Sequence, residues 1–367
     1  MNRSHKTRLI PTRAQAVMLA KTAGTARYAY NWGLAKWEEL YKAGERCSWP
    51  LLSRLWTTER PEWAKEVTRC VQTSAFVHLG GAYKAFFEKR RNHPTFHRKG
   101  LNDSFTIPID KGAVRGNRIR IPNIGYVKMA ESLRYTDCSI ISYVVSRKAG
   151  KWYVSIQVEL DSDVRTESTS VVGVDIGIKH WAVASDGTVL DRPAQLKHYE
   201  RCLKRKQRLL ARKAKGSANR AKAWLAVSKA YQKINNIKLD AIHKFTAVIA
   251  KNHGIAVIED LDVDGLKQSD LKGVRKGIQD SALAEIRRQL MYKCNNFVQV
   301  SRWFPSSKTC SHCGSIKADM SLSERTYHCP SCGHTLDRDL NAALNLLNEG
   351  LRIITLGHRE SACGETR

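Results

Sequence analysis

The spacing of apolar residues predicts one strand and two helical stretches in the first hundred residues. Residues 3–11 alternate weakly between polar and apolar side chains, which is typical of a strand, and Pro11 ends the run. Thr12 is a suitable cap for a helix that continues to about Gly44. A second helical stretch covers about residues 62–92. The chain is therefore expected to begin with a strand followed by a helical region.

Between residues 104 and 160 the pattern changes to short alternating runs. Strands are predicted at 105–107, 118–122, 140–145 and 152–158, with turns at Gly116 and Gly150. With residues 3–11 they predict a small antiparallel barrel or sheet, interrupted near its start by the helical insertion. The polar segment 161–170 is typical of a linker.

From residue 171 onward the pattern predicts an α/β domain. Strand, turn, strand, turn, strand is expected over 171–190, and a long helical pair over 195–253 is expected to break near Gly216-Ser217. The remaining predicted elements are a buried strand at 255–259, a helix at 281–294, a strand at 297–301 and a closing helix at 338–348. The fold class predicted for the whole chain is multidomain, α+β followed by α/β.

Composition adds a strong positive charge to this picture. The chain of 367 residues has 62 Lys and Arg against 34 Asp and Glu, a formal net charge of +28. Such an excess favours nucleic acid as the partner, with a ribosome-associated or simply basic protein as the alternative. No run of about 18 apolar residues is present, so no membrane partner is expected. Met1–Pro11 is too polar for a signal peptide, and we expect a cytoplasmic protein.

The positive charge is concentrated in the long helical region. Between Lys197 and Lys244 there are fifteen Lys or Arg and two acidic residues. An ordinary solvated helix mixes both signs, so this one-sided charge favours contact with a nucleic-acid backbone over a merely solvated face. The candidate contacts are Arg201, Lys204, Arg205, Arg208 and Arg212, on a helix expected to keep Leu203, Leu209 and Leu210 for packing.

Three carboxylates, each framed by an apolar run, are the candidate catalytic residues. Asp175 lies in the first hairpin segment, Glu259 ends a buried strand, and Asp339 lies in the first turn of the closing helix. Phosphodiester hydrolysis with two Mg²⁺ ions needs carboxylates from different elements to converge. Acids in this order indicate a metal-dependent nuclease with an RNase H-like fold.

These acidic positions also have structural alternatives. An aspartate after an apolar strand is commonly a turn former, and Asp260, Asp262 and Asp264 are compatible with a solvated loop. Asp337 competes with Asp339 and can serve as a helix cap only. The occurrence of three framed carboxylates in order, in so basic a chain, favours the catalytic interpretation.

A four-cysteine pattern precedes the closing helix. Cys310 and Cys313 form one C-x₂-C pair, and Cys329 and Cys332 form the next after fifteen intervening residues. This spacing is that of a zinc ribbon, and a glycine follows each pair where the turn needs an unhindered backbone. One structural Zn²⁺ is expected, because four thiolates leave no open position for catalysis. The other six cysteines are scattered and are given no function.

Four longer strings carry a family resemblance. They are GVDIG at 173–177, VIEDL at 257–261, FPSSKTCSHCG at 304–314 and DRDLNAA at 337–343. They resemble the TnpB family of insertion-sequence proteins, which are relatives of type V CRISPR effectors. The resemblance covers essentially the whole chain and is strongest over 171–347. It implies a bacterial or archaeal, nucleoid-associated protein, with a monomer favoured.

The resemblance implies an RNA-guided DNA endonuclease of a transposable element. A noncoding guide RNA would be bound, and complementary double-stranded DNA would be cut beside a short adjacent motif. A RuvC-type nuclease would cut with Asp175, Glu259 and Asp339 as ligands of two Mg²⁺ ions, since family usage favours Asp339 over Asp337. Arg325 occupies a position that is often basic in the family and would contact the scissile strand.

The expected domain map combines the pattern with this resemblance. It places a wedge-like β-barrel at 1–11 and 99–162, a helical recognition domain at 12–98, a RuvC-like nuclease domain at 171–301 and 335–350, a zinc ribbon that binds target nucleic acid at 302–334, and a tail at 351–367. Two rivals stay open: an RNA-guided repressor that does not cleave, and a DNA transposase proper. The intact acidic triad speaks against the first, and the lack of an obvious helix-turn-helix speaks weakly against the second.

Overall fold

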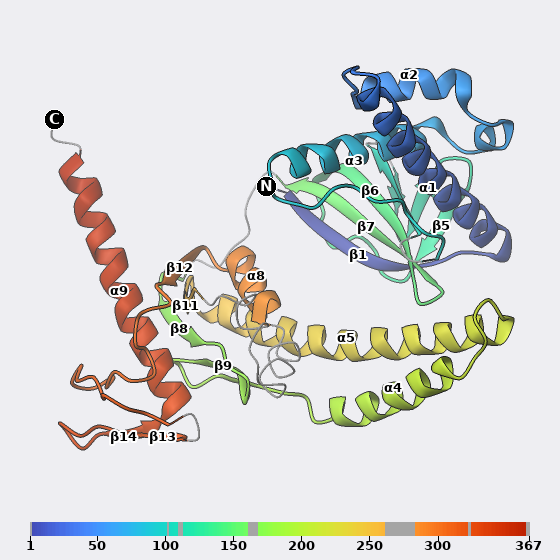
Figure 1. The fold of residues 1–367 in the computed structure, drawn as a ribbon. Coiled ribbons are helices and arrows are strands. Elements are labelled where there is room, and N and C mark those ends of the chain that lie inside the picture. The colour runs from blue at the N-terminus through green and yellow to red at the C-terminus, as the bar shows by residue number, and fades with distance from the viewer. Residues whose placement is uncertain are drawn as a thin grey trace. The chain divides into compact units, whose positions relative to one another are not determined.

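The computed structural model describes residues 2–100, 103–108, 113–160, 168–260, 283–321 and 324–364. The chain forms two compact units, residues 1–163 and 164–367, and each is described here by itself (Figure 1). Most of the predicted linker 161–170, and Asp262 and Asp264, lie outside the described residues. In the described part of the chain no helix is both long and apolar enough to cross a membrane.

A seven-stranded antiparallel sheet forms the centre of the N-terminal unit. Its strands are β1 Asn2–Ile10, β2 Ser104–Pro108, β3 Val114–Arg115, β4 Arg118–Ile121, β5 Gly125–Met129, β6 Cys138–Lys148 and β7 Lys151–Leu160. They lie in the order β2-β6-β7-β1-β5-β4-β3. The first strand of the chain is central because it pairs with β7 through Arg8 and then with β5 at Leu9 and Ile10. The predicted strands of this unit are confirmed.

The two halves of this sheet share one hydrophobic core. Phe105 on β2 and Ile119 on β4 belong to the same buried cluster, although their strands are far apart in the sheet order. The hydroxyl of Tyr143 on β6 donates a hydrogen bond to the carbonyl oxygen of Arg120 on β4 at 2.7 Å. These contacts require a curved sheet. Closure into the predicted barrel stays a prediction.

Helices are inserted between β1 and β2. They are α1 Arg13–Lys42, α2 Trp49–Glu59, the short 3₁₀ helix η1 Glu62–Glu66 and α3 Arg69–Phe87. α1 begins where predicted, because Thr12 and Gln15 satisfy each other's backbone N–H groups in a capping box. α2 was not predicted; its Pro50 is tolerated because it lies in the first turn. The stretch predicted over 62–92 is η1 followed by α3.

A five-stranded mixed sheet forms the centre of the C-terminal unit. Its strands are β8 Val171–Asp175, β9 His180–Ala184, β10 Val189–Asp191, β11 Ile255–Glu259 and β12 Asn296–Val300, in the order β10-β9-β8-β11-β12. β8, β11 and β12 are parallel neighbours, whereas β9 and β10 are antiparallel. All five strands were predicted, β11 with its observed bounds and β12 within one residue, and the order places β8 and β11 side by side.

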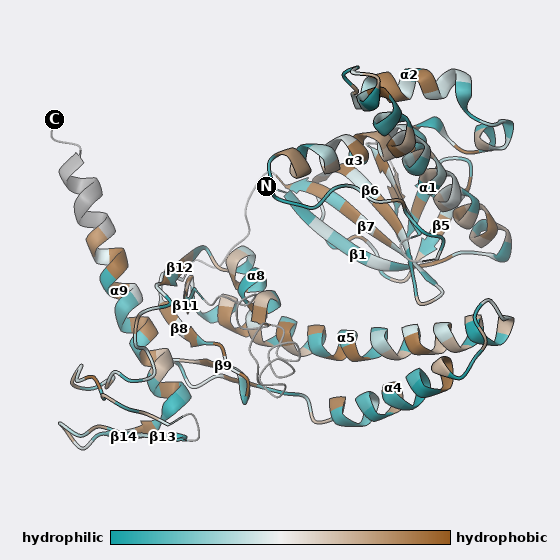
Figure 2. Ribbon diagram, viewed as in Figure 1, coloured by the Kyte–Doolittle hydropathy of each residue, from teal (hydrophilic) through white to brown (hydrophobic). Residues whose placement is uncertain are grey.

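Four helices of the described residues accompany this sheet. They are α4 Leu196–Ala211, α5 Ala218–Asn252, α8 Leu283–Lys293 and α9 Arg338–Gly364. α4 and α5 form a helical hairpin (Figure 1), and the predicted break is confirmed: Gly216 has a positive φ of 84° and Ser217 caps α5. Figure 2 shows α4 as largely hydrophilic along its length.

The closing helix is longer than predicted. It was expected to end near residue 348, with a tail from 351, but α9 continues to Gly364. Gly350 lies just beyond the predicted end. In the structure it lies inside the helix at a close approach, where a Cβ would stand 2.4 Å from Cγ2 of Val257. The glycine therefore serves helix–strand packing rather than termination.

Candidate active site

The three candidate carboxylates lie at one edge of the C-terminal sheet. Asp175 is the last residue of β8, and Glu259 is the last residue of β11. These strands are parallel neighbours paired as far as Val174 and Ile258, so their final residues emerge at the same edge. Asp339 reaches this edge on the first turn of α9. Three segments far apart in the chain thus supply one acidic cluster.

α9 is brought against β8 by a backbone contact at Gly173. A Cβ on this residue would stand 2.0 Å from the carbonyl oxygen of Ala343. From this contact Asp175 lies two residues along the strand, about 6.6 Å. Asp339 lies one turn back along the helix, about 6 Å. The two carboxylates are therefore level with each other because glycine lets helix and strand touch.

The surroundings of Asp175 are short of positive charge. Burial, the Asp339 carboxylate and the Glu259 carboxylate together raise the pKa of Asp175 to about 7, although the Arg338 guanidinium acts in the opposite direction. Asp175 keeps its proton near neutrality because it is buried and two further carboxylates lie beside it. Cations bound at this site would therefore be stabilising. The electrostatics of the cluster therefore fit divalent metal ions.

Glu259 faces this cluster, whereas its neighbour Asp260 does not take part in it. Burial raises the pKa of Glu259, and a weak hydrogen bond from Ser306 Oγ at 3.4 Å opposes the rise. Asp260 is instead paired with Arg287 at 3.1 Å and Arg302 at 3.4 Å. Glu259 and Asp260 are thus adjacent in the chain but have different partners. Sequence reasoning missed the Ser306 contact, whose only signal was its place in the string 304–314.

Asp337 and Asp339 also differ in the hydrogen bonds that their side chains form. Asp337 Oδ1 accepts from the backbone N–H of Asp339 at 2.9 Å and of Leu340 at 3.2 Å, so it caps α9. This is the structural alternative foreseen for Asp337. Asp339 lies one turn from Ala343 and acts electrostatically on Asp175. The geometry favours Asp339 as the acid directed at the cluster.

The three carboxylates are less closely grouped than the four cysteines. Among the described residues, the only group of three or more His, Cys, Asp or Glu side chains whose ligand atoms all lie within 4.8 Å of one another is the four-cysteine cluster. The ligand atoms of the three acids therefore do not all lie within that distance of one another. Carboxylates that hold two Mg²⁺ ions about 4 Å apart span a wider gap.

The four predicted cysteines come together as one cluster. The Sγ atoms of Cys310 and Cys332 are 3.7 Å apart, and those of Cys313 and Cys329 are 3.6 Å apart. Four thiolates about 2.3 Å from a tetrahedral zinc ion stand about 3.8 Å from one another. Backbone N–H groups of Cys332 and Ser331 lower the pKa of the Cys329 thiol to about 6. The cluster fits a four-thiolate Zn²⁺ site.

Two matching turns build this cluster, as the glycines predicted. In each turn the cysteine N–H donates to a carbonyl five residues on, at 2.8 Å for Cys310 and 2.9 Å for Cys329. The next glycine takes a positive φ, 75° at Gly314 and 72° at Gly333. The short strands β13 Thr326–His328 and β14 Thr335–Asp337 pair beside the turns, and β14 leads directly into α9.

Two buried asparagines attach the ribbon to α9, and sequence reasoning missed both. Asn341 accepts from the N–H of Ser311 at 3.0 Å and donates to the carbonyl oxygen of Thr309 at 2.7 Å. Asn345 donates to the carbonyl oxygens of Ser306 and Thr309 at 2.8 and 2.6 Å. The helix that carries Asp339 is therefore fixed to the zinc ribbon by polar contacts.

The predicted basic residues lie on the surface. All five candidates on α4 and the following turn are exposed: Arg201, Lys204, Arg205, Arg208 and Arg212. Leu203 is buried and Leu210 is partly buried, but the packing role predicted for Leu209 is wrong, because this side chain is 53% exposed. Leu209 is six residues beyond Leu203, which turns it by about 240° away from the packed face.

Arg325 is exposed next to the start of α9. Its carbonyl oxygen accepts from the N–H of Arg338 at 2.9 Å, one residue before the pairing of Thr326 with Asp337. In the part of the chain that the structure describes, no ion pair engages its guanidinium. The side chain is thus available near the acidic cluster.

Three family models match parts of this chain. One described as "Probable transposase" matches residues 155–270, and one described as "Cas12f1-like, TNB domain" matches 284–346. A third, described as a "Helix-turn-helix domain", matches residues 1–46. The sequence had offered no obvious helix-turn-helix, and the structure forms β1 and the single long helix α1 over most of this range.

Full-length relatives and a solved structure agree with these matches. "Putative RNA-guided DNA endonuclease InsQ" of Escherichia coli (strain K12) is 32% identical over 98% of this chain and 93% of its own. A "Putative RNA-guided DNA endonuclease" of Streptomyces pristinaespiralis is 32% identical over 100% and 92%. The fold resembles a chain of the Cas12f1–sgRNA–target DNA complex with a TM-score of 0.59 at 14% identity, covering 92% of this chain and 83% of that one. By identity and coverage, this chain belongs to the TnpB family of insertion-sequence proteins related to RNA-guided DNA endonucleases.

Proposed function

We propose that this chain is an RNA-guided DNA endonuclease that binds a noncoding guide RNA and cuts complementary double-stranded DNA beside a short motif. One observation carries the nuclease part: Asp175, Glu259 and Asp339 come to one sheet edge, where burial and the other two carboxylates raise the pKa of Asp175 to about 7. The names of the full-length relatives support the dependence on a guide.

The three carboxylates would hold two Mg²⁺ ions. When bound, these ions supply an activated water and stabilise charge on the attacking and leaving oxygens. Asp175 would hold a metal ion in its ionised form, although burial and two anions raise its pKa to about 7. Ser306 orients Glu259, and the pairs of Asp260 with Arg287 and Arg302 hold the end of β11.

The finer fold assignments belong to the same proposal. The order β10-β9-β8-β11-β12, with the first three strands antiparallel and the rest parallel, supports an RNase H-like nuclease of the RuvC type. The curved sheet of the N-terminal unit supports a wedge-like barrel, and its helical insertion a recognition domain. The four-thiolate Zn²⁺ is structural in this scheme, and through Asn341 it holds α9 in place.

Nucleic-acid contacts would come from the exposed cations of α4 and from Arg325. The segment from Arg201 to Arg212 has no acid, and such a basic run follows a phosphate backbone by neutralising it. Arg325 lies beside the start of α9, where it would contact the strand being cut.

Guide-dependent cleavage is the test of this function. The protein is purified with co-expressed RNA from the end of its element and incubated with Mg²⁺ and a matched or mismatched plasmid. We expect linear product only with the matched plasmid and none with Asp175→Ala. Cleavage that ignores the match would contradict the role of the guide.

The description "Probable transposase" for residues 155–270 favours a second candidate, DNA strand transfer by the same acids. The same assay separates the candidates, because a transposase joins donor and target DNA. A repressor would instead bind the matched plasmid and leave it uncut.

A further inference from the structure

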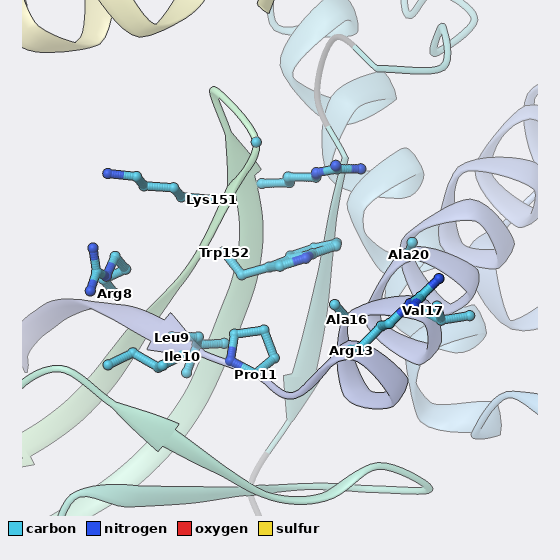
Figure 3. Close-up of a pocket in the computed structure, with 12 residues that line it drawn as sticks. Arg8, Leu9, Ile10, Pro11, Arg13, Ala16, Val17, Ala20, Lys151 and Trp152 are labelled. Atoms are coloured by element: carbon cyan, nitrogen blue, oxygen red, sulfur yellow. The ribbon is translucent and has the colours of Figure 1, made fainter.

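A pocket of about 500 Å³ lies in the N-terminal unit where β1 passes into α1. We name it the β1–α1 pocket. Its twelve lining residues are Arg8, Leu9, Ile10, Pro11, Arg13, Ala16, Val17, Ala20, Arg147, Gly150, Lys151 and Trp152. Figure 3 shows Trp152 and Pro11 between Arg8 and Lys151 on one side and Arg13 and α1 on the other. None of the proposed nuclease residues contributes to it.

The interior of this pocket is apolar. Trp152 and Leu9 are buried at 5% and 3% exposure and form its base. Ile10 and Val17 belong to the wall and are 43% and 53% exposed, so large apolar side chains face open space there. A planar apolar group can pack against such a surface.

The charge around the pocket has one sign. Four lining residues are cations, none is an acid, and all four cations are exposed: Arg8, Arg13, Arg147 and Lys151. Within the described residues none of them forms an ion pair, and Arg147 instead lies over the Trp152 ring at 5.7 Å. Unopposed cations around an apolar base are complementary to a ligand that is both anionic and aromatic.

The position of Arg13 strengthens this requirement for an anion. It is the first residue of α1, and no acid occupies the first turn of that helix. A cation at the positive end of a helix is unfavourable unless a negative group lies nearby. The helix end and the four side chains therefore direct the same sign of potential at the pocket.

We propose that the β1–α1 pocket takes one unpaired nucleotide of the guide RNA. The flanking phosphates lie against Arg13 and Lys151, and the base turns out of the stack against the exposed side chains of Ile10 and Val17. RNA is the expected occupant, because its loops and bulges offer unstacked bases, whereas target DNA enters as a duplex. The choice of guide RNA rests on the proposed function.

The first test removes charge at the pocket. Arg13→Gln combined with Lys151→Gln should weaken binding of the element's noncoding RNA on the order of tenfold and lower the slope of log K against log salt by about 1.4. The matched control is Arg118→Gln with Lys128→Gln, an exposed pair on β4 and β5 of the same unit. Equal losses in both double variants would overturn the proposal, since they would show diffuse attraction only.

The second test fills the pocket without changing its charge. Ala20 lines the pocket and is exposed, so Ala20→Trp should block the base and leave folding intact. Chemical probing of all unpaired bases should find one that is protected by the wild type and reactive with Ala20→Trp. No such base would refute the proposal.

The pocket proposal and the proposed nuclease function would fail in different ways. Normal RNA binding and cleavage in both variants would remove the pocket proposal and leave the nuclease in place. Selective loss of RNA binding in the variants, together with a wild type that binds RNA but never cuts, would support the pocket and refute the nuclease.

Discussion

The four-thiolate site and the three-carboxylate site of the same unit differ in how they are assembled. The thiolates come from two turns within twenty-three residues, and each turn is closed by its own backbone hydrogen bonds. The carboxylates come from β8, β11 and α9, which are separated by up to 164 positions between Asp175 and Asp339. The first site depends on local geometry, whereas the second depends on α9 being held against β8.

The largest expected effect tests which aspartate of the carboxylate site is a ligand. We expect Asp339→Asn to lower guide-dependent cleavage by at least about a hundredfold, because a metal-holding charge is lost. Asp337→Asn is the matched control two residues away, and should cleave nearly normally since Asn caps helices as well as Asp does. Normal cleavage by Asp339→Asn together with loss of cleavage in Asp337→Asn would identify Asp337 as the ligand.

The thiolate site should respond to the loss of a single sulfur. In Cys310→Ser we expect bound zinc, measured by elemental analysis, to fall from about one ion per chain to near zero. Cleavage should fall as well, because Asn341 and Asn345 fix α9 to the ribbon. Cys202→Ser, outside the cluster, should retain its zinc. Full zinc in the Cys310 variant would refute the four-thiolate site.

The difference in assembly also explains what the sequence could predict. Cysteine spacing and the following glycines sufficed for the two turns of the ribbon, because each turn is closed by local backbone hydrogen bonds. The strands of the second unit were predicted by their apolar runs, but no local pattern revealed that Gly173 and Gly350 are packing positions. The continuation of α9 past Gly350 was visible only in the structure. The choice between Asp337 and Asp339 likewise needed the hydrogen bonds at the start of α9.

A substitution at Gly173 should disturb the carboxylate site and leave the thiolate site intact. Gly173→Ala places a Cβ 2.0 Å from the Ala343 carbonyl oxygen, so α9 must shift away from β8. We expect the free energy of unfolding to fall by about 3 kcal/mol, seen as a lower urea midpoint, and cleavage to fall with it.

The matched control for that variant is Gly177→Ala. There the nearest atom to the new Cβ would be the His180 carbonyl oxygen at 3.1 Å, and the loss should be much smaller. Zinc content should be unchanged in both variants, because the thiolates do not touch Gly173. Normal stability of Gly173→Ala would show that α9 is not held by this contact.

A pH dependence of stability also belongs to the carboxylate site. Asp175 has a folded pKa of about 7 against an ordinary value of 3.8, so the folded chain holds this proton more tightly than the unfolded chain. Its contribution to stability is present below pH 3.8 and is lost as pH rises towards 7. We expect a decline of roughly 1 kcal/mol per pH unit within this range in Mg²⁺-free buffer. Asp175→Asn should flatten that part of the urea midpoint against pH, whereas the thiolate variant Cys310→Ser should keep it. A wild-type profile without this decline would show that the three carboxylates do not interact as the structure indicates.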